Sequence, residues 1–441
     1  MTLRQDRFRR VIEKMTEKTL ILFSASYPFS IAAEDTFLDP ELRRGIHLFS
    51  KIIAIPSRNE GSRNTAFPEL IVEEEFAQRF ERFKSEKIFM LRYLLKACAR
   101  RELFQDMWTN KKRMLNPLAF LKTIWVLAAA CLLEEWLCEY IESHMIDTRR
   151  TIFYTFWCNE ITLGLVLVKE RYPTMEIVSR ANGYDIYEEQ NSPPYIPFRA
   201  PTFGGLRGLY TVSKLARDYL AELYPAYADR MFFAHMGIEE PGFSVSASMD
   251  GSLNIASCAY IVPVKRIRLM ADGIIAYAKM AGSRSIFWTH IGGGDSRADL
   301  ETYAKKNAPT NLNVHFTGYV PSVYDYFRTH PVDFLMSTSS SEGVPVSIME
   351  AESLGIPVVA TAVGGVPEIV NDTCGQLLPP NPTPGQIADG ISMFVERTAH
   401  GANLRQGARE NWKANYNADT NYTLFFQHLL GYVENNNRRK E

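Results

Sequence analysis

The sequence lacks the residue patterns on which metal centres and disulfide scaffolds depend. Its six cysteines form no C-x-x-C or other ligand-spaced pair, and its eight histidines include no H-x-x-x-H spacing. Scattered cysteines of this kind are typical of reduced thiols in a reducing compartment. We therefore expect no metal site.

The sequence also lacks an excess of charge of either sign and a long apolar run. Its 441 residues include 49 Lys and Arg against 50 Asp and Glu, for a formal net charge of −1. This balance gives no reason to expect nucleic acid as a partner. The longest apolar run, residues 124–133, is half of the roughly 20 residues that a membrane-spanning helix needs, so it predicts a buried helix. With 46% hydrophobic and 22% charged residues, the composition is that of a soluble globular enzyme of two or three domains.

The sequence does contain a regular alternation of strand-like and helical runs, which is typical of parallel α/β sheets. A helical stretch over residues 72–144 interrupts the strands of the first half. The predicted strands cover residues 19–23, 51–55, 151–156, 176–180, 208–212, 254–262, 285–291, 313–316, 334–336, 358–360 and 374–378.

This pattern predicts an α/β fold of two doubly wound Rossmann-like domains that face each other across a cleft, with a helical insertion in the N-terminal half. The polar, small-residue stretch 239–251 is the best candidate for a linker. We expect a first domain over residues 1–245 and a second over residues 246–415. Residues 416–441 are expected to form a C-terminal helix that either ends the second domain or packs back on the first.

Two carboxylates eight positions apart, Glu342 and Glu350, are the most informative feature of the chain. The buried run 332–336 predicts a strand, and the run 345–354 predicts a helix with Pro345 in its first turn. Glu342 then lies on a strand-to-helix loop at the carboxyl end of a parallel strand, where open α/β sheets bind ligands. One interpretation is that the two carboxylates hold two hydroxyl-bearing parts of one ligand. The alternative is that both glutamates are solvated surface residues.

Three further loops carry chemistry of the same kind. Gly364 and Gly365 allow a backbone to approach a ligand closely, or they serve a turn only. Residues 292–294 are three glycines before a helix, which can present N–H groups to an anion. Lys265 and Arg266 stand at a helix start, where an anion such as a diphosphate would relieve their conflict with the helix dipole. Two solvated surface cations are the alternative.

As a set, these segments resemble the donor half of retaining glycosyltransferases with the GT-B fold, specifically family 4 (group 1 glycosyl transferases). The resemblance follows the chain through residues 263–265, 292–294, 314–318, 342–350 and 363–368. The first half resembles the acceptor half more loosely, through residues 26–29, 34–38, 179–185, 211–213 and 236–238.

The resemblance implies a role for each matching residue. Glu342 would contact hydroxyls of the donor sugar, and Glu350 would hold the ribose. Lys265 would neutralise the donor diphosphate and the charge that develops on it as it leaves. The other implied donor-binding residues are Arg266, Gly292, Gly293, Gly318, Tyr319, Gly343, Val344 and Pro345, and the candidates for acceptor contact are Glu34, Asn182 and Asp185.

Two positions depart from the family pattern. Ala259 and Tyr260 stand where many members carry Gly-Arg, so a second phosphate cation is missing there, and whether Arg266 substitutes for it stays open. Asn182 stands where many members carry histidine, and an amide does not titrate.

The function that the resemblance implies is retaining transfer of a sugar from a nucleoside-diphosphate sugar, with UDP favoured, to a glycan or lipid-linked glycan acceptor. It implies a cytoplasmic enzyme of bacterial surface polysaccharide biosynthesis, at the inner face of the cell membrane, that needs no metal and no cofactor. A nucleotide-sugar epimerase of the same architecture and a catalytically silent nucleotide-sugar-binding protein are the alternatives. The donor sugar, the acceptor, the linkage and the oligomeric state stay open.

A basic and aromatic stretch within the helical region suggests a further partner. Arg100, Arg101 and residues 111–113 stand beside Trp108 and Trp125. This combination favours contact with an anionic membrane surface. Helices that pack on the sheet with a solvated basic face are an equal alternative.

Overall fold

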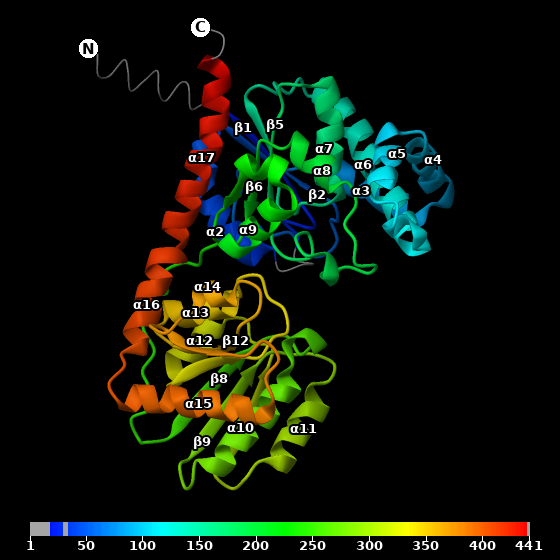
Figure 1. The fold of residues 1–441 in the computed structure, drawn as a ribbon. Helices are drawn as coiled ribbons and strands as arrows, with labels where there is room; N and C mark the ends of the chain where they lie inside the picture. The colour runs from blue at the N-terminus through cyan, green and yellow to red at the C-terminus, as the bar shows by residue number, and fades with distance from the viewer. Residues whose placement is uncertain (1–17, 30–33, 439–441) are drawn as a thin grey trace, which may run out of the picture. The chain divides into compact units, whose positions relative to one another are not determined.

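The chain divides into two compact units, and the computed structural model describes residues 18–29 and 34–438 of it (Figure 1). Unit 1 comprises residues 1–234 with 419–441, and unit 2 comprises residues 235–418. Each unit contains one parallel sheet with helical crossovers between its strands.

Unit 1 has a seven-stranded sheet in the order β3-β2-β1-β4-β5-β6-β7. The five strands predicted in this half are confirmed, whereas β3 and β7 were missed because they contain only two and three residues. Helices cover parallel strands on both faces, so these strands appear as continuous apolar runs. The strands are β1 (Thr19–Ser24), β2 (Lys51–Pro56), β3 (Ile71–Val72), β4 (Thr151–Thr155), β5 (Glu176–Ala181), β6 (Gly208–Thr211) and β7 (Met231–Phe233).

Unit 2 has a six-stranded sheet in the order β10-β9-β8-β11-β12-β13. The predicted strand 254–262 is too long, because β8 ends at Cys258. Beyond it, Ala259 N donates to Ile291 O at the end of β9 at 3.0 Å, and Ile261 N donates to Gly293 O in the loop after β9 at 2.7 Å. The strands are β8 (Leu253–Cys258), β9 (Ile286–Ile291), β10 (Leu312–Gly318), β11 (Phe334–Ser337), β12 (Val358–Thr361) and β13 (Gly375–Leu378).

Both sheets reverse their strand order at one place. In unit 1 the chain proceeds outward from β1 on one side and from β4 on the other, and in unit 2 it does so from β8 and β11. The loops after these strands diverge to opposite faces of the sheet and leave a crevice at its carboxyl edge, where open α/β sheets bind ligands. This topology therefore marks one candidate position in each unit.

The helices that connect the strands have the following bounds. In unit 1 they are α2 (Asp35–Gly45), α3 (Glu75–Ser85), α4 (Lys87–Cys98), α5 (Arg101–Thr109), α6 (Pro117–Ser143), α7 (Glu160–Arg171), α8 (Arg199–Gly205), α9 (Lys214–Leu223) and α17 (Ala418–Arg438), with short 3-10 turns η1 (Ile46–Leu48), η2 (Arg113–Leu115), η3 (Glu188–Gln190) and η4 (Pro225–Arg230). In unit 2 they are η5 (Pro263–Lys265), α10 (Ile267–Met280), α11 (Arg297–Asn307), α12 (Val323–Thr329), α13 (Val346–Ser353), α14 (Val366–Ile369), α15 (Pro384–Ala399) and α16 (Leu404–Asn415).

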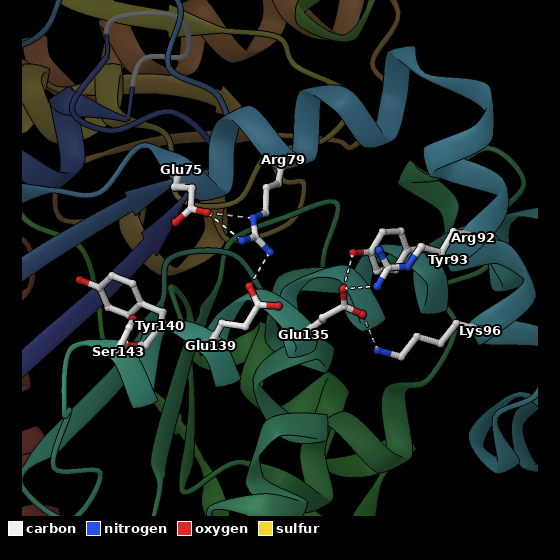
Figure 2. Close-up of polar contacts among 9 residues, drawn as sticks. All are labelled: Glu75, Arg79, Arg92, Tyr93, Lys96, Glu135, Glu139, Tyr140 and Ser143. Carbon is white, nitrogen blue, oxygen red and sulfur yellow. Dashed lines mark hydrogen bonds and ion pairs between the residues drawn. The ribbon is translucent and has the colours of Figure 1, made fainter.

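Helices α3 to α6 form a group at the outer edge of unit 1 (Figure 1). Ion pairs hold α3 and α4 against α6, as Figure 2 shows. The Arg79 guanidinium of α3 lies 2.8 Å from the carboxylate of Glu75 on the same helix and 2.8 Å from that of Glu139 on α6. The Glu135 carboxylate of α6 forms ion pairs with two cations of α4, Arg92 at 2.6 Å and Lys96 at 3.2 Å. The cations on these two faces are thus neutralised by carboxylates of α6.

Helix α6 is longer than the apolar run in the sequence indicates. It has 27 residues and a mean hydropathy of 1.6 over its most apolar window, and it is the one helix in the described part of the chain long and apolar enough to cross a membrane. Residues 127–133 are completely buried, and the helix packs against α3, α4 and α7. In this structure α6 is accordingly a core helix of unit 1.

A buried ion pair ties α2 and α17 to the sheet of unit 1. Arg180 of β5 lies 2.9 Å from Glu41 of α2, and both side chains are almost fully buried. The hydroxyl of Tyr154 on β4 donates to Glu41 at 2.7 Å. The Arg180 guanidinium lies 4.1 Å from the ring centroid of Phe425 on α17 and also donates to Ala234 O at 2.9 Å. One buried cation thereby joins four segments that are distant in sequence.

Replacing Arg180 by methionine should destabilise the protein strongly. The substitution leaves Glu41 buried without its cation, and breaking a buried pair in this way costs about 3–5 kcal/mol. Urea denaturation measures the loss in free energy of unfolding. Arg82→Met is the matched control: Arg82 pairs with Glu86 on the exposed surface, so its loss should leave the free energy of unfolding nearly unchanged. Equal losses in the two variants would contradict the assigned role.

Candidate functional site

Two opposite charges meet where the strand order of unit 2 reverses. Lys265 stands in η5, after β8, and Glu342 stands in the loop after β11. Lys265 Nζ lies 2.6 Å from Glu342 Oε1, with side chains 28% and 11% exposed. The two residues are far apart in sequence, and the crevice of the sheet brings them together. The pair is shielded from bulk solvent but remains within reach of a ligand at the carboxyl edge.

The backbones of these two loops are held together by hydrogen bonds. Ser340 N donates to Val264 O at 2.8 Å, and the Ser340 hydroxyl donates to the same oxygen at 3.2 Å. The Thr338 hydroxyl donates to Arg266 O at 3.2 Å. These hydrogen bonds hold the two loops side by side, so the backbone keeps Lys265 close to Glu342.

Arg266 acts as a clamp for these loops. Its guanidinium donates to four oxygen atoms: Thr338 O at 2.6 Å, Ser339 O at 2.7 Å, Pro380 O at 2.8 Å and Asn381 Oδ1 at 2.9 Å. Its backbone adopts a left-handed conformation, with φ +49°. The Arg266 guanidinium therefore holds these loops together through protein oxygens, and the phosphate-binding role expected from the sequence stays a prediction.

The glycines after β12 support the glutamate loop directly. A Cβ atom at Gly364, where φ is +51°, would lie 1.8 Å from Glu342 O. Gly365 N donates to Gly343 O at 2.9 Å, and a Cβ at Gly365 would lie 3.0 Å from Val344 Cγ2. Both glycines thus permit a close approach between two protein backbones. The loop with Glu342, Gly343 and Val344 then enters α13 through the buried Pro345.

The loops after β9 and β10 also come together. Gly292 N donates to Gly318 O at 2.9 Å, and a Cβ at Gly292 would lie 1.9 Å from Ala259 O. Gly293 has free space around it, since a Cβ there would have its nearest neighbour, Tyr319 N, at 3.9 Å. Tyr319 is exposed. The structure therefore places Gly292, Gly293, Gly318 and Tyr319 side by side on the carboxyl edge of the sheet.

Glu350 lies on α13 with its carboxylate available. Burial raises the pKa of Glu350 to about 7. The nearby Cys258 thiol, at the end of β8, has a pKa of about 12 because it is buried and close to the Glu350 charge. Within the described residues, the Glu350 carboxylate has no hydrogen bond or ion pair. A partly buried carboxylate without a protein partner is suited to accept hydrogen bonds from the hydroxyl groups of a ligand.

In unit 1 the carboxylate of Glu34 lies where the strand order reverses. It accepts N–H groups from the loop after β1, from Ala25 at 3.0 Å, Ser26 at 2.7 Å and Tyr27 at 3.0 Å. It also accepts the indole N–H of Trp157, after β4, at 2.6 Å. Glu34 is almost fully buried. Through these hydrogen bonds, Glu34 joins the two loops that border this crevice.

Asp185 and Asn182 lie after β5, next to that crevice. Asp185 is buried and accepts the N–H groups of Cys158 at 2.9 Å, Asn182 at 2.8 Å and Gly183 at 2.9 Å. The Asn182 amide donates to Phe156 O at 3.1 Å, and its Oδ1 has no hydrogen-bond partner within the described residues. Asp185 therefore shapes the loop, and Asn182 is the residue of the two with a free acceptor.

Two aromatic residues at this place were missed from the sequence. The rings of Trp157 and Tyr184 lie 5.3 Å apart, and Tyr184 is exposed. Aromatic faces of this kind pack well against the apolar faces of cyclic ligands. In the sequence, the one feature that could have identified Trp157 as a site residue is its position just after a buried strand. The nearness of Tyr184 follows only from the pairing of β4 with β5.

No group of three or more potential metal ligands occurs among residues 18–29 and 34–438. At the crevice of unit 2, the loops carry the Lys265 ammonium, which is paired with Glu342.

Comparison with known sequences places unit 2 in a known class. Residues 254–397 match the model of the family described as "Glycosyl transferases group 1", so unit 2 carries a group 1 glycosyl transferase domain. The chain is 34% identical over 93 residues to the O-antigen biosynthesis glycosyltransferase WbnH of Escherichia coli, covering 21% of this chain and 26% of that protein. It is 27% identical over 161 residues to the amylovoran biosynthesis glycosyltransferase AmsK of Erwinia amylovora, covering 35% and 39%.

A third relative matches over a longer segment. The chain is 35% identical over 216 residues to the D-inositol 3-phosphate glycosyltransferase of Saccharomonospora viridis, covering 44% of this chain and 48% of that protein. The chain thus matches about a quarter to a half of the length of these curated relatives.

Solved structures show the same fold over nearly the whole chain. The lipopolysaccharide outer core galactosyltransferase WaaB in its apo form superposes with a TM-score of 0.63 at 13% identity, covering 95% of this chain and 99% of that one. Anabaena HepE in complex with UDP superposes with a TM-score of 0.61 at 13% identity, covering 94% and 99%. The fold class expected from the sequence, two Rossmann-like α/β domains of the GT-B type, is confirmed.

Replacing Gly364 by alanine should destabilise unit 2. The new Cβ would overlap Glu342 O, and the left-handed backbone is strained for any residue with a side chain. The free energy of unfolding should fall by about 2 kcal/mol or more in urea denaturation. Gly385→Ala is the matched control, because its nearest neighbour would lie at 3.9 Å and alanine favours the helix there. A neutral Gly364→Ala variant would show that the two loops are not in close contact.

The raised pKa of Glu350 predicts a pH dependence of stability. The carboxyl ordinarily titrates near 4.5 and titrates at about 7 in the folded protein, so the folded state binds the proton more tightly. Its contribution to stability is complete below the ordinary pKa and is lost as the pH rises through about 7. Relative to Glu350→Gln, the wild type should lose about 2–3 kcal/mol between about pH 5 and pH 8. Thermal unfolding at several pH values tests this; parallel curves for the two proteins would refute it.

Proposed function

We propose that the protein is a glycosyltransferase of bacterial surface polysaccharide biosynthesis. It transfers a sugar from a nucleoside-diphosphate sugar to a hydroxyl of a glycan or lipid-linked glycan acceptor, with retention of the anomeric configuration. The group 1 domain over residues 254–397 supports the reaction class. The names of WbnH and AmsK support the polysaccharide, and the complex of HepE with UDP supports a UDP-sugar donor.

The observation that carries this proposal is the meeting of Lys265 and Glu342 at the strand-order reversal of unit 2, with Glu350 unpaired on the helix that follows. A diphosphate in this crevice would contact the Lys265 ammonium. The sugar hydroxyls would donate to Glu342, and the ribose hydroxyls would donate to Glu350. One cation and two carboxylates match one anionic and two hydroxyl-bearing parts of a nucleotide sugar.

In the proposed reaction the bond between the anomeric carbon and the diphosphate oxygen breaks, and a bond from the acceptor oxygen forms on the same face. The acceptor proton passes to the departing diphosphate oxygen. Lys265 stabilises the negative charge that grows on this oxygen, which is an electrostatic contribution from a preplaced cation. We propose that no metal ion and no further cofactor are required, so that EDTA leaves the rate unchanged.

The donor site can be tested by nucleotide binding. A saturating nucleoside diphosphate, such as UDP at about 100 times its Kd, should add about 2.7 kcal/mol to the free energy of unfolding and raise the thermal midpoint. Lys265→Ala should abolish this shift, because the phosphate charge loses its counter-ion. Lys279→Ala is the control, since Lys279 is an exposed cation at the end of α10 in the same unit.

Acceptor-dependent release of the nucleotide then tests the reaction class. A transferase releases nucleotide only with an acceptor, an epimerase turns over without one, and a silent binder releases none. Glu342→Ala and Glu350→Ala should each reduce release by about 100-fold or more while the thermal midpoint without ligand stays close to that of the wild type. Near-normal release in both variants would overturn the assignment.

A further inference from the structure

The connection between α5 and α6 exposes a concentration of large apolar side chains. Trp108 at the end of α5 is 81% exposed, and Leu115 in η2 is 84% exposed. Soluble surfaces expose single apolar residues routinely, but a group of this kind on neighbouring elements marks an interaction site. We call this group the apolar tip; its members are Phe104, Trp108, Leu115, Leu118 and Leu121.

The segment that carries most of the apolar tip has charges of one sign in its sequence. Residues 107–133 include no Asp or Glu, whereas the protein as a whole is balanced. Lys111 and Lys112 are exposed and have no carboxylate partner within the described residues, and Lys111 Nζ lies 6.0 Å from the centroid of the Trp108 ring. This differs from the faces of α3 and α4, where carboxylates of α6 neutralise the cations (Figure 2).

The apolar tip is held in place by the body of unit 1. Asp106 of α5 accepts Phe198 N at 3.0 Å, and Arg113 of η2 lies 2.6 Å from Glu188. Lys122, one turn into α6, donates to Tyr195 O at 2.7 Å. The exposed side chains therefore stand on an anchored backbone, so contact does not require ordering of the backbone.

The tip continues directly into the core. Leu118 and Leu121 are exposed in the first turns of α6, and residues 127–133 of the same helix are completely buried. The apolar surface outside and the core inside are thus two ends of one helix. Two exposed turns are too short to enter a bilayer deeply, but they suit the boundary between headgroups and acyl chains.

We propose that the apolar tip docks onto the surface of an anionic lipid bilayer. Trp108 and the leucines would enter the headgroup region, and Lys111 and Lys112 would lie at the level of the lipid phosphates. A second copy of the chain is a poorer occupant, because a symmetric contact would bring the lysines of both copies together. The docking goes beyond the proposed glycosyl transfer and does not depend on it, although a lipid-linked acceptor would lie at the same surface.

The test is binding of the full chain to vesicles of phosphatidylcholine, with or without about 30% phosphatidylglycerol, measured by co-sedimentation. Wild type should bind the anionic vesicles and lose this binding at about 0.5 M salt, where charges are screened. Lys111→Glu/Lys112→Glu should lower the partition coefficient about 10-fold or more, since each basic residue near the surface contributes roughly one kcal/mol. Trp108→Ser/Leu115→Ser should lower it by a similar factor.

Two control variants carry equivalent changes elsewhere. Leu215→Ser/Leu223→Ser removes two exposed leucines of α9, and Lys279→Glu/Lys306→Glu reverses two exposed charges of unit 2. Both should bind vesicles as the wild type does. The tip variants should keep the thermal midpoint and any nucleotide-induced shift of the wild type, which separates a failure of docking from a failure of the donor site.

Three results would overturn the proposal: no binding of the wild type to anionic vesicles, equal binding of tip variants and controls, or binding that is equally strong on neutral vesicles. A wild-type dimer that becomes monomeric in Trp108→Ser/Leu115→Ser, as measured by light scattering, would assign the apolar tip to a second copy and overturn it as well.

Discussion

The reversal of strand order in each parallel sheet is the constraint on which the rest of the structure depends. Because the loops on either side of the reversal turn to opposite faces, only there does the carboxyl edge open. In unit 2 this opening brings Lys265 within 2.6 Å of Glu342. In unit 1 it brings Trp157 within 2.6 Å of Glu34. The same topology produces a partly exposed ion pair in unit 2. In unit 1 it produces a buried carboxylate whose oxygens already accept hydrogen bonds from the protein.

Close backbone packing then determines how well the crevice of unit 2 is defined. Gly364 lies against the carbonyl of Glu342, and Gly292 lies against the carbonyl of Ala259. The Arg266 guanidinium joins the loop after β11 to residues 380–381. The residues expected to touch a ligand are thus few, and most of the glycines and the second cation serve to hold them. Preorganised groups of this kind stabilise developing charge without reorganising during the reaction.

Charges in this protein fall into two groups. Those between packed elements are matched, as in the pair of Arg180 and Glu41 or the carboxylates of α6 that face α3 and α4. At the two inferred contact surfaces, three charged side chains have no ion-pair partner within the described residues: Glu350 in the crevice of unit 2, and Lys111 and Lys112 at the apolar tip. A protein with a formal net charge of −1 therefore presents distinct local charge at these two surfaces.

The sequence by itself determined the two α/β domains, most strands and the place of Glu342 on a strand-to-helix loop, because buried parallel strands are continuous apolar runs and the glutamate loop is a local motif. It missed β3 and β7, which are too short to show a pattern, and it extended β8 past Cys258 into a loop that pairs with its neighbour. Only the tertiary structure decided that Arg266 is a clamp, that Tyr184 lies beside Trp157, and that Trp108 faces solvent while residues 127–133 are buried. The reason is that hydrogen-bond partners and burial depend on segments distant in the chain, which local pattern does not encode.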